Sequence, residues 1–506
     1  MDGYPLLEGE SRPKQEGRSN FVVAYALIAS ICSAMSGYSS GVMSGAVLFI
    51  REDLNINYIQ EEILLGSLVL VSLVGTIVAS LVADTVGRKK SMLVAAIIVL
   101  FGCLLMGLAP SFWVLLLGRI ITGIGYGFSF MVVPLYIAEV SPPEIRGRFL
   151  SFPELFLNSG ILLGYVSSFC LAKLPVFISW RLMVGLGALP AIILAFGISI
   201  IPESPRWLVL QGRINEAFST LILTSDHESE AEQRLNDIIV AAGNKKHKDL
   251  ASAGDAVEST DHKLHNKMSD RDQEAGVNLA GTDHKHQLRH VWLELLWPTT
   301  SNLRFTLFVV LGLQFFQQAT GVCVLLYYSP DIFQKAGFHS SSGSLGATVM
   351  VGIAKDVSIP VATIFLDRIG RRPLLLLSNI GVTVSLLTIA TRFSVQAIYP
   401  NSTLHGYLTI AACCSFMIFF SMGFGPIGAL LPSEILPLRL RAQGMGLSTA
   451  FNRCLSGILS LSFLSIFKAF GAAGTFWLFA GMSSISIFFL YFFVPETKGR
   501  TLEELS

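Results

Sequence analysis

Long apolar segments alternate with short charged segments along most of this 506-residue chain. A helix needs about 20 apolar residues to cross a bilayer. Six segments of this kind precede the centre of the chain, at 22–50, 63–83, 91–109, 112–137, 149–171 and 182–201. Six more follow it, at 303–328, 344–366, 373–391, 407–431, 443–467 and 474–494. The pattern predicts an all-α integral membrane protein with twelve transmembrane helices.

Charged motifs occur twice, in the same order, in the two halves of the chain. The motif DTVGRK begins at Asp84 and the related DRIGRR begins at Asp367, which is 367 − 84 = 283 residues later. Two further pairs keep nearly this offset: Glu139 to Arg146 with Glu434 to Arg441, and Pro202-Glu203 with Pro495-Glu496. Internal repeats are typical of transporters. We expect two pseudo-symmetric six-helix halves, 22–202 and 303–494, with terminal tails at 1–21 and 495–506.

Composition agrees with a membrane protein and indicates its orientation. The hydrophobic fraction is 52%, the charged fraction is 14% and the mean hydropathy is +0.60. Most Lys and Arg residues of the short loops fall on one side of the predicted helices, which indicates that both termini are cytoplasmic. The net charge of +1 gives no reason to expect nucleic-acid binding. All seven cysteines lie inside apolar segments, so no disulfide framework is predicted.

The central segment 203–302 differs from the rest of the chain. Within it, TSDHESEAEQRLND (224–237) has the pattern of a charged amphipathic helix, and the stretch from Ala241 to Gln287 reads as a flexible linker on the cytoplasmic side. Seven of the nine histidines lie here at varied spacing and without cysteines. A solvated linker explains them better than a metal site, and we expect no metal and no cofactor.

Several motifs make the chain resemble the sugar porter branch of the major facilitator superfamily. They are GRKK, GRRP, PESPRWL (202–208), QQATG (317–321), YYSPDIF (327–333) and PETKG (495–499). SFPELFLNSGILLGYVSSF and PLRLRAQGMG are most similar to plant polyol and monosaccharide transporters. The resemblance implies the major facilitator fold, a monomer in the plasma membrane, and transport of a sugar or sugar alcohol by alternating access. Proton symport is the typical mode of such transporters.

The repeated motifs predict a latch on the cytoplasmic side. Acidic residues at helix ends and cations in the short loops can form charge-assisted hydrogen bonds with neighbouring helices. One half contributes Asp84, Arg88, Glu139 and Arg146, braced by Glu203. The other contributes Asp367, Arg371, Glu434 and Arg441, braced by Glu496. The alternative, charges that only set topology, explains the cations but not the paired acids.

Polar residues in the predicted helices indicate a substrate site between the halves. The resemblance implies that Gln317, Gln318 and Asn452 bind sugar hydroxyl groups, and that Phe316 and Tyr327 offer aromatic surface. An amide suits a hydroxyl because both groups donate and accept hydrogen bonds. Hydrogen bonding between helices is the alternative role for these amides. It is as good an explanation as ligand binding for Asn452.

Charged residues inside the apolar segments are costly and therefore informative. Glu154 and Lys355 stand where general sugar porters usually have glutamine and asparagine. We expect the two side chains to approach each other across the cavity and to touch substrate. The alternative is that Glu154 faces the cytoplasmic vestibule while the long side chain of Lys355 reaches toward water.

Energy coupling is the main departure from the family pattern. Proton-coupled sugar porters have an aspartate in the first helix, near an arginine that is Arg119 in this chain, but here the residue is Ser39. Serine does not titrate in the physiological range, which predicts uniport. Glu154 and Asp356 are the competing candidates for a proton carrier. Cys323 and Ala429 also replace the usual asparagine and tryptophan. A wider or less selective cavity is one expected outcome of these replacements, and weak or lost transport is the other.

Other features discriminate between function classes. The chain has no nucleotide-binding loop, HExxH pattern or Gly-x-Ser-x-Gly pattern, which argues against a pump driven by ATP and against an enzyme. A sugar sensor without transport activity is the remaining alternative to a carrier. The short tails disfavour it, because they leave little room for a signalling domain. Asn401 begins a glycosylation sequon in an expected external loop, and an unused sequon is equally consistent.

Overall fold

The computed structural model describes residues 16–142, 147–225, 227–240, 295, 297–298, 300–338, 340–398, 404–437 and 440–497. These residues form helices and no strand. The helices of the first half are α1 (Glu16–Leu54), α2 (Tyr58–Val86), α3 (Arg88–Gly107), α4 (Phe112–Val140), α6 (Phe152–Leu171), α7 (Val176–Gly185) and α8 (Ala188–Gly197). Two short helices follow, α9 (Pro205–Leu210) and α10 (Ile214–Thr224), and residues 228–240 are also helical.

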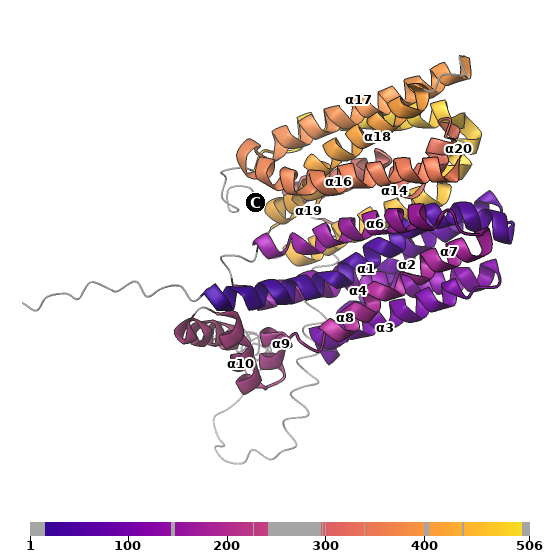
Figure 1. Ribbon diagram of the computed structural model, residues 1–506. Helices are drawn as coiled ribbons and strands as arrows, with labels where there is room; N and C mark the ends of the chain where they lie inside the picture. The colour runs from indigo at the N-terminus through magenta and orange to yellow at the C-terminus, as the bar shows by residue number, and fades with distance from the viewer. Residues whose placement is uncertain are drawn as a thin grey trace, which may run out of the picture.

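The second half has the same general plan. Its helices are α13 (Ser301–Ala319), α14 (Val322–Tyr327), α15 (Ser329–Lys335), α16 (Ser341–Ile369), α17 (Arg371–Ile398), α18 (Leu404–Met422), α19 (Phe424–Ile435) and α20 (Arg441–Phe493). In Figure 1 the first half, indigo to magenta, lies beside the second, orange to yellow. The two halves meet where α6 packs on α16 and α2 packs on α20.

The number of membrane crossings agrees with the sequence prediction. Eleven helical stretches of the described residues are long and apolar enough to cross a membrane. Ten of them cross once. The last one, Gln443–Phe493, breaks at Gly471, where φ is 72° and ψ is 173°, so it supplies two crossings and brings the total to twelve. The prediction of an all-α, twelve-helix integral membrane protein is confirmed.

The sixth crossing begins before the apolar segment 182–201 of the sequence. The helical stretch begins at Val176 and includes Arg181. A charge inside a helix in the membrane is costly unless it has a partner. In the structure Arg181 donates to Asp53 Oδ2 at 2.8 Å, and its guanidinium lies 3.8 Å from the centre of the Phe177 ring. A partner on α1 therefore allows the helix to start earlier.

Glycines bring α1 and α6 into backbone contact. A Cβ atom on Gly37 would lie 1.9 Å from the Leu157 carbonyl oxygen, and one on Gly160 would lie 2.2 Å from the Ala34 carbonyl oxygen. Small residues at such positions let two membrane helices approach closely enough for dense packing. This contact fixes the position of α6, which carries Glu154.

The helix bundle has two ends, the motif face and the opposite face. The motif face holds the repeated motifs, at residues 84–89, 139–142, 203–207, 367–372, 434–437 and 494–497. It lies at the left in Figure 1, on the side of α9 and α10. The opposite face holds residues 51–58, 331–338 and 463–471. At this face α2 begins with a capping box, in which Asn57 Oδ1 accepts from the Gln60 N–H at 2.9 Å.

Candidate functional site

The motif face of the first half contains a buried ion pair. Arg88, the first residue of α3, donates from Nε to Glu139 Oε2 at 2.9 Å and from Nη2 to Oε1 at 3.1 Å. The two side chains are only 7% and 6% exposed. Asp84 lies 3.4 Å from Arg88 Nη1, but its side chain is 71% exposed. An exposed pair of this kind contributes little, so Glu139 is the principal partner of Arg88.

Glu203 binds the start of α3 from the other side. Its Oε1 accepts from the backbone N–H groups of Arg88 and Lys89 at 2.9 and 3.0 Å. The first N–H groups of a helix have no partner within the helix and favour a negative charge. Gly87 makes this approach possible, because its φ is +101° and a Cβ there would lie 2.4 Å from Glu203 Oε2.

The second half repeats this arrangement group by group. Arg371 Nη2 donates to Glu434 Oε1 at 3.0 Å, and the N–H groups of Arg371 and Arg372 each donate to Glu496 at 3.1 Å. Gly370 has φ +103°, like Gly87. The Thr497 hydroxyl donates to Glu434 at 2.5 Å, just as the Ser204 hydroxyl donates to Glu139 at 2.5 Å.

Some residues of the predicted latch do not enter these networks or cannot be assessed. Arg441 donates from Nε to the Leu436 carbonyl oxygen at 3.3 Å and forms no ion pair with a described residue. Arg146 lies outside the described residues, and the side chain of Asp367 does not belong to them either. Each described network stays within its own half of the molecule. A role in alternating access remains a prediction.

The opposite face carries a charged contact that the sequence analysis did not single out. Arg51 on α1 pairs with Glu61 on α2 at 2.7 Å and with Asp331 on α15 at 2.8 Å, so it joins the two halves. Glu62 accepts from the Ser465 N–H at 2.7 Å and from its hydroxyl at 2.9 Å, which joins α2 to α20. A signal was present in the sequence, because adjacent acids at the start of an apolar helix require partners.

Asn452 is the centre of an amide cluster in the second half. Its Nδ2 donates to Gln314 Oε1 and to Gln317 Oε1, both at 2.7 Å, and its Oδ1 accepts from Gln318 Nε2 at 3.0 Å. Gln314, Gln317 and Gln318 lie on one face of α13 because their spacing matches a helical turn. Cys323 completes the cluster with an Sγ that donates to Gln318 Oε1 at 3.0 Å.

A count of hydrogen bonds separates the roles of the three glutamines. Each amide nitrogen has two N–H donors. Gln314 uses both, toward the Gly428 carbonyl oxygen at 2.7 Å and Ser448 Oγ at 2.9 Å. Gln317 uses one, toward the Phe424 carbonyl oxygen at 2.6 Å, and Gln318 uses one, toward Asn452. Among the described contacts, Gln317 and Gln318 therefore each keep one N–H for a ligand, whereas Gln314 serves as scaffold.

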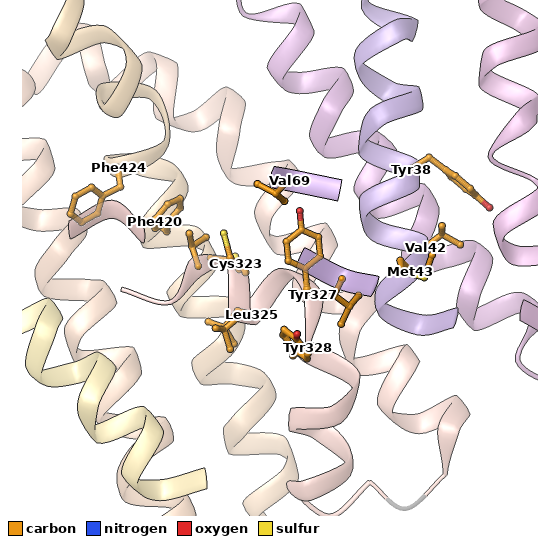
Figure 2. Close-up of a cluster of buried hydrophobic side chains, with 14 of the residues drawn as sticks. Tyr38, Val42, Met43, Val69, Cys323, Leu325, Tyr327, Tyr328, Phe420 and Phe424 are labelled. Carbon is orange, nitrogen blue, oxygen red and sulfur yellow. The ribbon is translucent and has the colours of Figure 1, made fainter. Parts of the chain in front are cut away.

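The two aromatic candidates lie in different places. Tyr327 is 6% exposed, and Figure 2 shows its ring below Val69 of the first half and to the right of Cys323 of its own half. Phe316 lies on the face of α13 away from the amide cluster, and its ring packs on Phe489 of α20 at 5.0 Å between centroids. This position does not fit the predicted contact of Phe316 with substrate. Phe316 is adjacent to Gln317 in sequence, but consecutive side chains on a helix point about 100° apart, so the two do not share a face.

Charged side chains from both halves gather near this cluster. Glu154 on α6 is exposed, and its Oε1 lies 3.9 Å from where a Cβ of Gly425 on α19 would stand. Its carboxylate experiences the charges of Lys355 and Arg453. Among the described residues, however, Glu154 and Lys355 form no ion pair within 4.0 Å, contrary to the expectation that each fixes the other.

Two further contacts cross between the halves at this level. Ser159 on α6 donates to Asp356 on α16, at 3.1 Å from Oδ2. Arg453 on α20 places its guanidinium 3.9 Å from the centre of the Phe130 ring on α4. Arg453 is not among the predicted site residues, although a cation within the apolar segment 443–467 is the same kind of signal that identified Lys355.

Ser39 and Arg119 are direct neighbours. Arg119 is 0% exposed, and its Nη1 donates to the Ser39 carbonyl oxygen at 2.7 Å and to Ser39 Oγ at 3.2 Å. Its Nε donates to the Leu64 carbonyl oxygen at 3.2 Å. Ser39 is thus in hydrogen-bond contact with the arginine through both its carbonyl oxygen and its hydroxyl. That a proton-coupled carrier would hold a carboxylate at this position remains a prediction. Asn401, the sequon residue, lies outside the described residues.

Twelve apolar helical crossings in two matched halves, with polar groups of both halves in contact, are typical of a multi-pass membrane transporter. The chain belongs to the sugar transporter family, because the family model described as "Sugar (and other) transporter" matches residues 25–262 and 250–506.

Individual relatives agree with this assignment. The chain is 41% identical over 502 residues to probable polyol transporter 4 of Arabidopsis thaliana, over 98% of this chain and 88% of that protein. It is 42% identical over 493 residues to polyol transporter 5 of the same plant, over 97% and 87%. Its fold is similar to the inward open conformation of the xylose transporter XylE from E. coli, with a TM-score of 0.74 and 23% identity, over 96% and 99% of the two chains.

Proposed function

We propose that this protein carries a sugar alcohol or a monosaccharide across a membrane by alternating access. The observation that carries the proposal is the amide cluster, in which Gln317 and Gln318 each retain one N–H donor. Gln317 contacts Phe424, and Glu154 of the other half faces the adjacent Gly425. A ligand bound to the amides would therefore lie next to Glu154. The polyol transporters among the relatives support a polyhydroxyl substrate.

The donors and acceptors suit a chain of hydroxyl groups. Gln317, Gln318, Lys355 and Arg453 supply donors, and Glu154 supplies an acceptor that has no ion pair within 4.0 Å among the described residues. A hydroxyl group both donates and accepts, so a linear polyol can bond to both kinds of group along its length. Tyr327 offers aromatic surface close to Cys323, where the carbon skeleton would pack.

The mode of transport follows from the contact of Ser39 with Arg119. A serine hydroxyl stays protonated at physiological pH, so this pair cannot release a proton during the cycle. Facilitated diffusion is therefore the favoured mode. Asp356 is the second candidate for coupling, because its carboxylate bonds to Ser159 of the other half and would feel any separation of the halves.

Orientation is inferred from charge. The motif face carries Arg88, Lys89, Arg371 and Arg372 at the starts of α3 and α17. Cations beside short connections are typically retained on the cytoplasmic side, so both termini are inferred to be cytoplasmic and the opposite face is inferred to lie outside the cell. The plasma membrane is the expected location, and a monomer is the expected form.

The proposal is tested by uptake of labelled sorbitol, mannitol, myo-inositol, glucose and xylose into cells that lack sugar carriers. Gln318→Ala is expected to raise KM for the preferred substrate about five- to tenfold, the effect of losing one neutral hydrogen bond. Gln211→Ala is the matched control, because Gln211 is exposed at the motif face. Absence of saturable uptake in protein that reaches the membrane would refute the carrier function and favour a sensor.

Coupling is tested in the same cells at acidic and neutral external pH, with and without a protonophore. Facilitated diffusion predicts uptake that stops at equal concentrations and resists the protonophore. A proton moving through 100 mV gains about 2.3 kcal/mol, enough for roughly fiftyfold accumulation. Concentrative uptake that collapses with the protonophore and is lost in Asp356→Asn would instead establish symport through Asp356.

A further inference from the structure

A cavity of about 200 Å³ lies at the opposite face, between α1 and α2 of the first half and α15 and α20 of the second. Its polar lining is formed by Arg51, Tyr58, Glu61, Asp331 and Lys335, and Phe463 and Phe467 supply aromatic surface. A single water needs only about 10–15 Å³ of such space. The cavity therefore has room for a small organic molecule. It is distinct from the amide cluster, because none of its lining residues belongs to that cluster.

The charges of this cavity balance. Arg51 and Lys335 are cationic, and Glu61 and Asp331 are anionic, so the net charge is zero. Arg51 bonds to both acids, at 2.7 and 2.8 Å. A charged ligand gains no net electrostatic attraction from a lining whose charges sum to zero. A neutral polar ligand, in contrast, finds both hydrogen-bond donors and acceptors there.

Two groups of the cavity lack full partners. Asp331 Oδ2 is buried and has no hydrogen bond among the described residues. A buried carboxylate oxygen without a partner is costly and rare in native structures. Lys335 Nζ lies 4.2 Å from the centre of the Phe467 ring and forms no ion pair with any described carboxylate within 4.0 Å. The cavity thus presents an unmet acceptor and available donors beside an aromatic ring.

We propose that this cavity is a second binding site, which takes a neutral polyhydroxyl molecule such as a sugar alcohol. One hydroxyl of the ligand donates to Asp331 Oδ2 and another accepts from Lys335, while the carbon skeleton packs on Phe467. Both halves supply the walls, so the site exists only while the halves are closed at this face. Binding therefore favours that closed state, since a ligand stabilises the conformation to which it binds.

The choice of a sugar alcohol as ligand rests on the proposed function. The assumption that the opposite face lies outside the cell rests on the proposed orientation. Protection of Lys335 from a membrane-impermeant amine reagent tests the site in intact cells. Burial lowers the pKa of Lys335, which leaves more of the reactive neutral amine. Sorbitol is expected to slow labelling of Lys335 at least about threefold, measured by mass spectrometry of the labelled peptide.

Lys173 is the matched control, because it is exposed in the loop between α6 and α7. Its labelling is expected to stay constant as sorbitol is added. Equal labelling of Lys335 with and without sorbitol, mannitol or myo-inositol would overturn the proposal. Labelling of Lys335 from the cytoplasmic side alone would overturn the orientation on which the experiment depends.

Two variants distinguish this site from the amide cluster. Gln318→Ala weakens the central cluster, and protection of Lys335 is expected to persist in it. Loss of protection in this variant would show that sorbitol acts from the central site, which refutes a second site. Asp331→Asn replaces the unmet acceptor and is expected to weaken protection at least about threefold. Its labelling rate without sorbitol shows whether the face still closes once the contact with Arg51 is weakened.

Uptake and protection are independent results. Protection of Lys335 in a protein that transports none of the tested sugars would refute the proposed carrier function and leave this site standing. Saturable uptake without protection would refute this site alone.

Discussion

The buried pair between Arg88 and Glu139 allows a quantitative test of the motif-face networks. Glu139→Gln removes the negative charge and leaves the Arg88 guanidinium only 7% exposed and without its principal counter-charge. Breaking a buried pair by removing one partner costs about 3–5 kcal/mol. Asp84→Asn is the matched control on the same arginine. Asp84 is 71% exposed, so its removal should cost at most about 1 kcal/mol.

The assay measures the apparent melting temperature of the detergent-solubilised protein, determined from the fraction of protein that stays monodisperse after heating to each temperature. Unfolding of a membrane protein of this size is not two-state, so the rank order of variants is the result to compare. We expect Glu139→Gln to melt lowest and Asp84→Asn to melt near the unmodified protein. Glu434→Gln should fall between them, because the Arg371 and Glu434 side chains are 20% and 18% exposed. Equal melting of all three variants would refute the reasoning from burial.

Two further predictions concern the first helix. Arg119 Nη1 lies 3.2 Å from Ser39 Oγ, so Ser39→Asp would place a titratable carboxylate next to this arginine. We expect uptake by this variant to depend on external pH. Uptake that remains independent of pH would contradict this prediction. Gly37→Ala puts a Cβ 1.9 Å from the Leu157 carbonyl oxygen and should sharply reduce the yield of folded protein. Gly481→Ala is its control, since nothing lies within 4 Å of a Cβ there, and comparable yields of both variants would show that α1 and α6 separate easily.

The membrane crossings were predictable because a bilayer imposes a simple requirement on length and polarity. The apolar pattern alone did not show where the sixth helix begins, because a charge near its start is neutralised by a residue far away in sequence. Arg181 interrupted the apolar pattern, and nothing near it in the chain showed that Asp53 would be its partner. The break at Gly471 has a different cause, because an apolar pattern does not show whether two crossings are joined by a loop or by a bend in continuous helix.

The site was only partly predictable for a related reason. Helical spacing places Gln314 on the same face as Gln317 and Gln318. The prediction nevertheless named only the adjacent pair, together with its neighbour Phe316. The position of Phe316 could have been inferred, since it lies on the other side of α13 from the amides. The free N–H of Gln318 could not have been inferred from the sequence. It depends on which groups of α19 and α20 accept hydrogen bonds from the other amide N–H donors.

The distribution of charged contacts fits the demands of alternating access. Contacts that hold one half together can be permanent, whereas contacts between halves must break in every cycle. The Arg88 and Glu139 side chains are at most 7% exposed, so separating them would leave charges without water. Arg51, which joins the halves, is 40% exposed, and water can solvate its guanidinium as Asp331 moves away. The Arg88–Glu139 pair therefore stiffens the first half. Between the halves, the Arg51 contact can open at a smaller cost in free energy than the contact of Glu62 with Ser465, because Glu62 is only 3% exposed.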